Sequence, residues 1–287
     1  MDIRERVIDL IKKKDSELPT LPAVVDRIIA AASDSKTTTE ELAEIISFDQ
    51  GITNKLLILS NSVYYGQRTK VATIKRAITV IGFDEIIGIA LAMSILSSFT
   101  EKSGLGLDMK VLWIHAIGTA TAAKELAKRT NPSIADKIFI PALLHDMGKI
   151  ILAIYFKDEY IEVRQKAIEE KKTLYVVENQ ILKINHAILA ALLMKRWNFP
   201  DSILTPCRFH HTPEKCPVKL QHMTLIVNLA DYLCQKAGIG HSGNPVPVTI
   251  KNSFQKVGTN AQILRMIIEK LKKKEDQIKE FFRITTD

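Results

Sequence analysis

Seven side chains between residues 115 and 231 combine a type that binds metal ions in proteins with a suggestive sequence context. They are five histidines and two aspartates: His115, His145, Asp146, His186, His210, His211 and Asp231. Imidazole nitrogens and carboxylate oxygens are suitable ligands for first-row transition metals, and the set includes no thiolate. The residue types therefore indicate a metal site, provided that the fold brings them together.

The two aspartates lie in strongly apolar surroundings. Asp146 follows Phe-Ile-Pro-Ala-Leu-Leu-His, and Asp231 follows Leu-Ile-Val-Asn-Leu-Ala. An ionised carboxylate in a helical core is costly unless it is paired, hydrogen-bonded or bound to a metal, and one cation would offset the cost of both. Each histidine alone is more often a hydrogen-bonded core residue, and the alternative for the whole set is a polar cluster satisfied by hydrogen bonds and water. Together the seven side chains favour a metal site.

Helical periodicity with no convincing strand alternation predicts an all-α fold. Leu18-Pro-Thr-Leu-Pro22 separates the first two helices, Thr38 and Glu41 form a capping box, Gly82 ends a helix and Asp84 caps the next. Later helices are expected at Lys110–Arg129, Ile134–His145, Lys149–Lys171, Thr173–Leu182, Ile184–Trp197, Asp201–His210, Val218–Lys236 and Asn260–Phe282.

The clearest internal boundary is the segment Gly104-Leu-Gly106 with Asp108. It predicts an N-terminal helical lobe over residues 1–105 and a second helical lobe over residues 106–237, which contains the His/Asp residues. Residues 238–287 are expected to form a loop, rich in Gly, Asn and Pro over Gly238–Pro247, and a C-terminal helical extension.

Composition and charge are those of an ordinary globular protein. Hydrophobic residues make up 46% and charged residues 25% of the 287 residues. The start lacks a signal-peptide core, and the most apolar stretch, Ile86–Phe99, is too short for a membrane span. We therefore expect a cytoplasmic protein without a membrane partner. The net charge of +8 includes two lysine runs beside acidic residues, which favour solvated helix faces over a nucleic-acid patch.

Three cysteines, Cys207, Cys216 and Cys234, form no C-x-x-C pair. Their odd number argues against a disulfide framework, and their spacing argues against a zinc knuckle. We expect all three to be small buried residues.

The order of four of the candidate ligands resembles the H…HD…D signature of the HD superfamily. These are His115, then His145-Asp146, then Asp231, and Leu-Leu-His-Asp-Met-Gly-Lys is close to the usual H-D-(Ile/Met)-Gly-Lys. The resemblance implies that the four side chains bind a divalent metal inside a helical core.

Three further histidines resemble the ligands that complete a two-metal site in the HD-GYP branch of the superfamily. They are His186, His210 and His211. In such a site Asp146 would bridge both ions, which would activate a water and hold a phosphate. Lys149, one helical turn after His145, would then face a phosphate oxygen, and it is a candidate catalytic residue only if the protein is an enzyme; the alternative is a solvent-facing helix lysine.

A set of motifs in the N-terminal half is similar to the HDOD family (HD-related output domain) and extends the resemblance over roughly residues 15–235. They are Leu18-Pro-x-Leu-Pro22, Ser47-Phe-Asp49, Lys55-Leu-Leu-Ile-Leu-Ser-Asn-Ser62 and Ile74…Ala77-Ile78…Ile81-Gly82, with Trp197-Asn-Phe-Pro200 and His-His-Thr-Pro later in the chain. The departures are Gln50, where proline is common, and Ala142, where glycine is usual. The resemblance implies a multi-helix fold in which an N-terminal lobe packs on an HD-like core.

The HDOD resemblance implies a bacterial signalling or regulatory protein that acts through partner proteins, with metal bound because all the ligands are retained. Iron or manganese is the expected metal, in one or two ions, with zinc, magnesium and nickel as alternatives. The second reading is a metal-dependent phosphohydrolase that acts on a nucleotide or cyclic dinucleotide. Against it, no glutamate follows His210-His211 directly, and no G-Y-P segment is present. A nucleotide or phosphate ligand fits either reading, and a nucleic-acid-associated regulator ranks third.

Overall fold

The computed structural model describes residues 3–13, 18, 21–34, 36–99 and 107–286. Within these ranges the chain forms helices joined by turns and loops, and no strand is present. The predicted all-α fold is therefore confirmed. Apolar side chains from one end of the described chain to the other share a single hydrophobic core.

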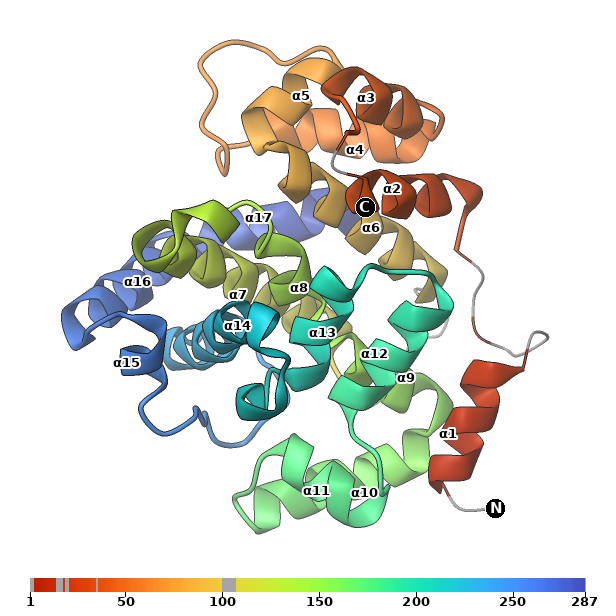
Figure 1. The fold of residues 1–287 in the computed structure, drawn as a ribbon, viewed down its shortest axis with the longest axis vertical. Helices are drawn as coiled ribbons and strands as arrows, with labels where there is room; N and C mark the ends of the chain where they lie inside the picture. The colour runs from red at the N-terminus through yellow and green to blue at the C-terminus, as the bar shows by residue number, and fades with distance from the viewer. Residues whose placement is uncertain (1–2, 14–17, 19–20, 35, 100–106, 287) are drawn as a thin grey trace.

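The N-terminal helices form one end of the molecule, above the rest in Figure 1. After the arm α1 (Ile3–Lys12) they are α2 (Ala23–Ser33), α3 (Thr39–Ser47), α4 (Gln50–Ser60), α5 (Ile74–Ile81) and α6 (Phe83–Phe99). Helix α6 is buried along most of its length and contacts α2, α4 and α5 on one side and α8 on the other. It therefore joins this end of the molecule to the core.

Two of the three helix ends predicted in this region are present in the structure. The side chain of Thr38 accepts a hydrogen bond from the N–H of Glu41 at 3.2 Å, and the carboxylate of Glu41 accepts one from the N–H of Thr38 at 2.7 Å. Gly82 ends α5 with φ of +104°, a conformation that favours glycine. Helix α6 begins at Phe83, so Asp84 lies inside its first turn and the predicted cap at Asp84 is wrong.

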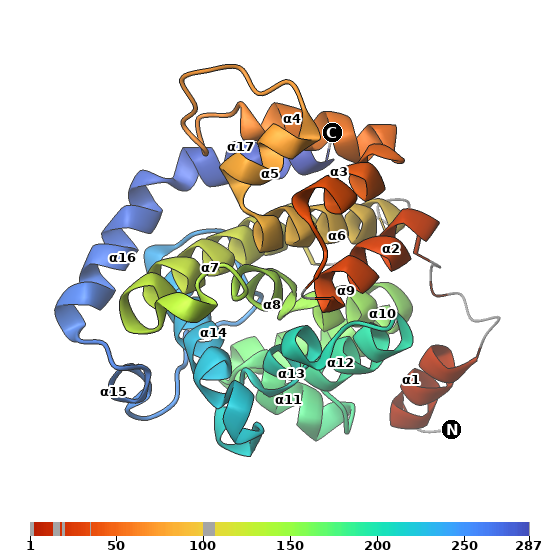
Figure 2. The same ribbon diagram turned by 45° about the horizontal axis from the view of Figure 1, so that its top comes forward.

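The central helices carry the candidate ligands. They are α7 (Met109–Thr130), α8 (Phe139–Leu144), α9 (Met147–Tyr155), α10 (Lys157–Glu169), α11 (Leu174–Ile181), α12 (His186–Arg196), α13 (Asp201–Phe209) and α14 (Val218–Ala237), with single turns η2 (Pro132–Ile134) and η3 (Pro213–Lys215). Helices α7 and α14 pack against each other and against α8, while α12 packs against α9 and α13. Figure 2 shows the same helices with the top of the molecule turned towards the viewer.

Three predicted helices are shorter or broken in the structure. The helix expected over Lys149–Lys171 breaks at Phe156, whose backbone leaves the helical region while its side chain is buried. The helix expected over Asn260–Phe282 divides at Lys274, and the one over Ile134–His145 is α-helical only from Phe139 to Leu144. The breaks at Phe156 and Lys274 contain no proline or glycine, so packing decides them, whereas Pro141 in the first turn of α8 disfavours an α-helix that continues from residue 137.

The C-terminal helices lie along the core and reach the N-terminal end of the molecule. They are α15 (Ser253–Val257), α16 (Ala261–Lys273) and α17 (Glu275–Thr286), and α17 packs against α4, α6 and α7. The ammonium of Lys55 in α4 donates to the carbonyl of Thr285 at 3.2 Å. The predicted boundary near residue 105 lies outside the described residues, and the division into 1–105, 106–237 and 238–287 remains a prediction.

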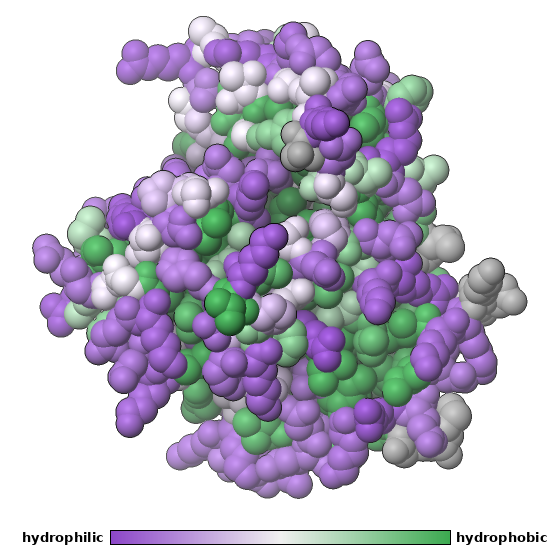
Figure 3. All heavy atoms as spheres, viewed as in Figure 1, coloured by the Kyte–Doolittle hydropathy of each residue, from purple (hydrophilic) through white to green (hydrophobic). Residues whose placement is uncertain are grey.

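Figure 3 shows mostly hydrophilic side chains on the visible face, with apolar patches between them. Among the described residues, no single helix is both long and apolar enough to cross a membrane; α5 and α6 meet these limits only as a pair bent by 109°. The three cysteines are buried and free, as predicted.

Candidate metal centre

The His145-Asp146 pair lies where one helix ends and the next begins. His145 is the C-cap of α8, and Asp146 is the N-cap of α9. Gly148 lets α9 approach α12 closely, because a Cβ atom at Gly148 would lie 1.9 Å from the carbonyl oxygen of His186. The His-Asp-Met-Gly motif therefore directs two polar side chains inward and allows the close helix packing that brings His186 to them.

The other candidate ligands come from four further places in the fold. His186 is the first residue of α12, whose start is capped by Asn185. His210 is the C-cap of α13, with His211 directly after it. His115 lies within α7 and Asp231 within α14, and these two helices pack extensively on each other.

One half of the cluster contains His115, His145, Asp146 and Asp231, all buried. The Nε2 atom of His115 lies 2.9 Å from Oδ1 of Asp231, and Nε2 of His145 lies 3.9 Å from the same oxygen and 3.3 Å from Oδ2 of Asp146. The amide of Gln235 donates to Oδ1 of Asp231 at 2.7 Å. Asp231 is thus buried beside His145, as predicted.

The other half surrounds Oδ1 of Asp146. The Nε2 atoms of His186 and His210 lie 3.3 and 3.8 Å from this oxygen, and the Nε2 atoms of His186 and His211 are 3.0 Å apart. Metal–ligand bonds of about 2.1 Å meeting at 90–109° place neighbouring donor atoms about 3.0–3.4 Å apart. The spacing of these atoms is close to the edges of such a coordination polyhedron.

Hydrogen bonds on the far side of two rings fix which nitrogen carries the proton. Nδ1 of His145 lies 2.8 Å from the carbonyl oxygen of Ala142, and Nδ1 of His210 lies 2.6 Å from that of Cys207. A carbonyl oxygen only accepts, so Nδ1 of each ring is the donor, and Nε2 faces Asp146 with a lone pair whenever the ring is neutral. Within the described residues, Nε2 of both rings and Oδ1 of Asp146 are buried without a hydrogen-bond partner. A cation fits this set of donor atoms.

The two aspartates are ionised despite their burial. Burial opposes ionisation of Asp146, but the charges of His145 and Lys149 hold the pKa of its carboxyl well below the ordinary value. Burial also opposes ionisation of Asp231, but its contact with His115 lowers the pKa of the carboxyl to about 2. Both aspartates are therefore carboxylates, the form that binds metal ions.

The pKa values of three of the histidines shift in two directions. Burial lowers the pKa of His210 to about 3, with further lowering by neighbouring His145 and His186, and burial also lowers the pKa of His211. Burial alone would lower the pKa of His145 too, but the charges of Asp146 and Asp231 outweigh it and raise that pKa. His210 and His211 are consequently neutral near pH 7, the state in which imidazole binds metals.

Lys149 is completely buried, so the solvent-facing alternative is wrong. Its ammonium donates to Oδ2 of Asp146 at 2.6 Å and to the carbonyl of Ser242 at 2.9 Å. Ser242 belongs to the predicted loop Gly238–Pro247, which lies over the cluster: Gly240 approaches the backbone of His115 so closely that a Cβ atom would lie 2.3 Å from its nitrogen. The phosphate contact of Lys149 remains a prediction.

Sequence reasoning missed the residues of α11 that border the site. Glu178 is fully buried, and its Oε2 accepts hydrogen bonds from Nδ1 of His186 at 2.6 Å and from the backbone N–H of His186 at 2.8 Å. The ring of Tyr175 lies 4.6 Å from that of His211. The available signal was a glutamate in the apolar stretch Leu-Tyr-Val-Val-Glu, eight residues before His186.

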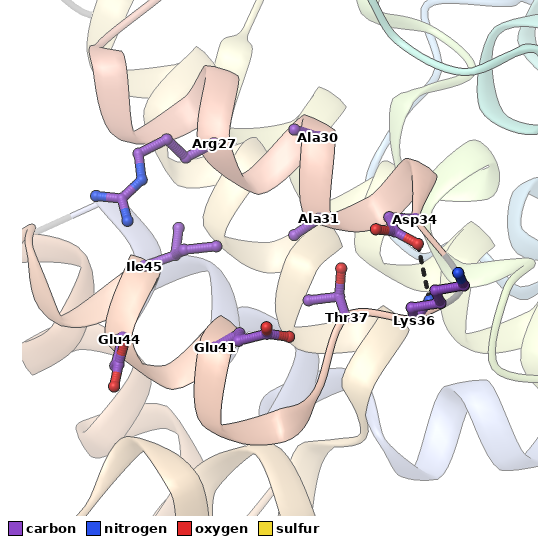
Figure 4. A pocket seen from close by; sticks show the side chains of 9 residues that line it. All are labelled: Arg27, Ala30, Ala31, Asp34, Lys36, Thr37, Glu41, Glu44 and Ile45. Atoms are coloured by element: carbon purple, nitrogen blue, oxygen red, sulfur yellow. Dashed lines mark hydrogen bonds between the residues drawn. The ribbon is translucent and has the colours of Figure 1, made fainter.

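A pocket at the N-terminal end of the molecule is separate from this cluster. It has a volume of about 440 Å³ between α2 and α3, and its lining includes Arg27, Asp34 and Glu41 (Figure 4). Oδ1 of Asp34 accepts a hydrogen bond from the N–H of Lys36 at 2.9 Å. None of the candidate metal ligands lines it.

These features define an all-α protein in which a buried His/Asp cluster is assembled from several helices. The chain belongs to the HDOD family, because the model of the HDOD domain matches residues 18–213. A crystal structure of an HDOD domain protein with unknown function from Geobacter sulfurreducens is 25% identical, with a TM-score of 0.79 over 98% of this chain and 95% of that chain.

Two more distant crystal structures share the fold. One, from Marinobacter aquaeolei VT8, is provisionally assigned to signal transduction; it is 19% identical, with a TM-score of 0.81 over 99% of this chain and 65% of that chain. The other, from Shewanella amazonensis SB2B, is provisionally assigned as a phosphohydrolase; it is 18% identical, with a TM-score of 0.75 over 98% of both chains. An uncharacterized protein of Treponema pallidum (strain Nichols) is 24% identical over 269 residues, which are 90% of this chain; the chain spans 51% of that relative.

Proposed function

We propose that this protein binds a divalent metal at the His/Asp cluster and acts in bacterial signal transduction through contacts with partner proteins. The observation that carries the proposal is Oδ1 of Asp146, which is buried without a hydrogen-bond partner and faces the Nε2 atoms of His186 and His210 at 3.3 and 3.8 Å. A buried carboxylate oxygen that faces lone pairs is best satisfied by a cation.

The ligand set favours iron or manganese, because every candidate donor is nitrogen or oxygen; zinc, magnesium and nickel are the alternatives. One ion would be held by His115, His145, Asp146 and Asp231. A second would be held by the other three histidines, His186, His210 and His211, with Asp146 shared between the two. A bound ion would supply positive charge and Lewis acidity in the middle of the helical core.

Two observations support a signalling role in preference to turnover. A cavity that borders Asp146 between α7, α8 and α9 has a volume of about 10 Å³, roughly the space that one water molecule needs. The ammonium of Lys149 is occupied by Asp146 and Ser242, so it presents no free charge to a phosphate. The provisional signalling assignment of the Marinobacter protein agrees with this role.

The second candidate function is a metal-dependent phosphohydrolase acting on a nucleotide or cyclic dinucleotide. The retained ligand set and the provisional assignment of the Shewanella protein favour it. Turnover would require Lys149 to leave Ser242, so that a phosphate could reach the cluster beneath the loop Gly238–Pro247. We rank this function second.

The test combines metal analysis with turnover assays. Protein purified without chelators should contain iron or manganese, and Asp146→Ala should lose most of it, because Asp146 is shared by both groups of candidate ligands. Wild-type protein loaded with either metal should show no multiple turnovers against a panel of nucleotides and cyclic dinucleotides. Turnover that disappears in Asp146→Ala would instead establish the phosphohydrolase, and metal-free wild-type protein that binds no added metal would refute the metal site.

A further inference from the structure

Glu178 differs from the groups that orient the other two histidine rings facing Asp146. The rings of His145 and His210 donate from Nδ1 to backbone carbonyls, whereas the ring of His186 donates to a carboxylate oxygen at 2.6 Å. Glu178 is fully buried on α11, and its Oε1 atom has no hydrogen-bond partner among the described residues. His186 is thus backed by a negative charge that the other two rings lack.

Burying this carboxylate is costly, and apart from the nearby hydroxyl of buried Tyr160 its partner is a single residue. Both hydrogen bonds that Oε2 accepts come from His186, one from the ring and one from the backbone N–H at the start of α12. The ion pair that Glu178 forms within the described part of the chain is also with His186. A neutral acceptor would satisfy the same two donors at a smaller desolvation cost. Capping and hydrogen bonding alone therefore do not explain why a charged residue is present at this position.

The charge acts through the ring of His186. An acceptor at Nδ1 fixes the proton there and leaves the lone pair on Nε2, which lies 3.3 Å from Oδ1 of Asp146 and 3.0 Å from Nε2 of His211. A carboxylate behind an imidazole raises the basicity of the opposite nitrogen, and such outer partners typically contribute 10- to 100-fold to metal affinity.

We propose that Glu178 is a positioning residue that sets the tautomer and strengthens the metal bond of His186. The inference rests on the proposed metal binding, and it makes His186 the strongest of the histidine donors facing Asp146. The competing explanation is that Glu178 only caps the start of α12 through the backbone N–H of His186.

The two explanations differ in the effect of Glu178→Gln, which keeps the shape and an acceptor oxygen but removes the charge. The positioning role predicts that affinity for Mn²⁺ or Zn²⁺, measured by calorimetric titration, falls about 10- to 100-fold. It also predicts that the metal-free variant melts at the wild-type temperature or above, because a buried charge is gone. Exposed Glu162 in α10 provides the matched control, since Glu162→Gln should alter neither quantity.

A lower melting temperature of metal-free Glu178→Gln with unchanged metal affinity would establish the capping role and overturn the proposal. If the variant does not fold, NMR of the wild type decides: ¹⁵N-labelled, zinc-loaded protein should show a proton on Nδ1 of His186, and a proton on Nε2 would overturn the proposal. Failure of the wild type to bind metal would refute the proposed function itself, whereas equal affinity of wild type and Glu178→Gln would refute only this inference.

Discussion

At the scale of single residues, the cluster depends on which ring nitrogen of each histidine carries the proton. The backbone carbonyls of Ala142 and Cys207 accept hydrogen bonds from the Nδ1–H groups of His145 and His210, which leaves Nε2 facing inward. The sequence supplied the residue types and their apolar surroundings, from which a metal site was predicted. It contained no information on tautomers, because the carbonyls that fix them are backbone atoms available at every position.

His210 gives a pH-dependent stability to the metal-free protein. Burial lowers its folded-state pKa from 6.5 to about 3, so between these values the unfolded chain binds the proton and the folded chain does not. The stabilisation by neutral His210 is complete above about pH 6.5 and is lost as the pH falls towards 3, by at most about 1.4 kcal/mol per pH unit. Urea unfolding of the metal-free protein at pH 7, 5.5 and 4.5 measures it.

The comparison with His210→Gln isolates this contribution from the opposite effect of His145, whose pKa is raised. The variant should lose less stability than wild type between pH 7 and 4.5. Identical slopes for wild type and His210→Gln would contradict the buried, neutral state of His210.

At the scale of helices, periodicity and caps predicted where most elements begin, and packing decided where several of them end. The capping box at Thr38 and the glycine at Gly82 are local signals, and both hold in the structure. The breaks at Phe156 and Lys274 have no such signal, because they depend on how side chains pack in the core or against a neighbouring helix. Helix α11 was predicted as Thr173–Leu182, but the sequence did not show that its Glu178 and Tyr175 lie beside the site, because that depends on packing.

The approach of α9 to α12 depends on Gly148. A Cβ atom there would lie 1.9 Å from the carbonyl oxygen and 2.9 Å from Cα of His186, and backbone atoms of a packed helix cannot move aside cheaply. We expect Gly148→Ala to destabilise the protein by about 1–3 kcal/mol. It should also weaken metal binding, since His186 must shift away from Asp146. Denaturant unfolding and metal titration of the purified variant measure both effects.

A glycine in another helix provides the control. At Gly51 in α4 the nearest atom to an added Cβ is a side-chain oxygen of Asp49 at 3.3 Å, so Gly51→Ala should change stability by less than about 1 kcal/mol and leave metal affinity unchanged. Full stability and metal affinity in Gly148→Ala would show that the close packing of α9 on α12 is not needed for the site.

At the scale of the whole molecule, the candidate site is a property of tertiary packing. Its side chains come from α7, α12 and α14 and from the ends of α8, α9 and α13, which are separated by up to 116 residues between His115 and Asp231. No periodicity in the sequence predicts that these segments meet. The HDOD resemblance anticipated the convergence, and the physical reason is visible only in the fold, where α7, α8 and α14 pack together and α12 lies against α9 and α13.

Because the ligands join most of the central helices, metal removal should destabilise the molecule as one unit. An ion present at a thousand times its Kd stabilises the folded state by about 4 kcal/mol, which corresponds to a rise of about 5–15 °C in Tm for a domain of this size. Calorimetry of metal-loaded protein should show one cooperative transition that moves down by this amount after treatment with a chelator. His186→Ala and Asp146→Ala should lose most of the shift, because each removes a ligand of the group around His210. A chelator-dependent shift of wild-type size in both variants would place the bound metal elsewhere in the molecule.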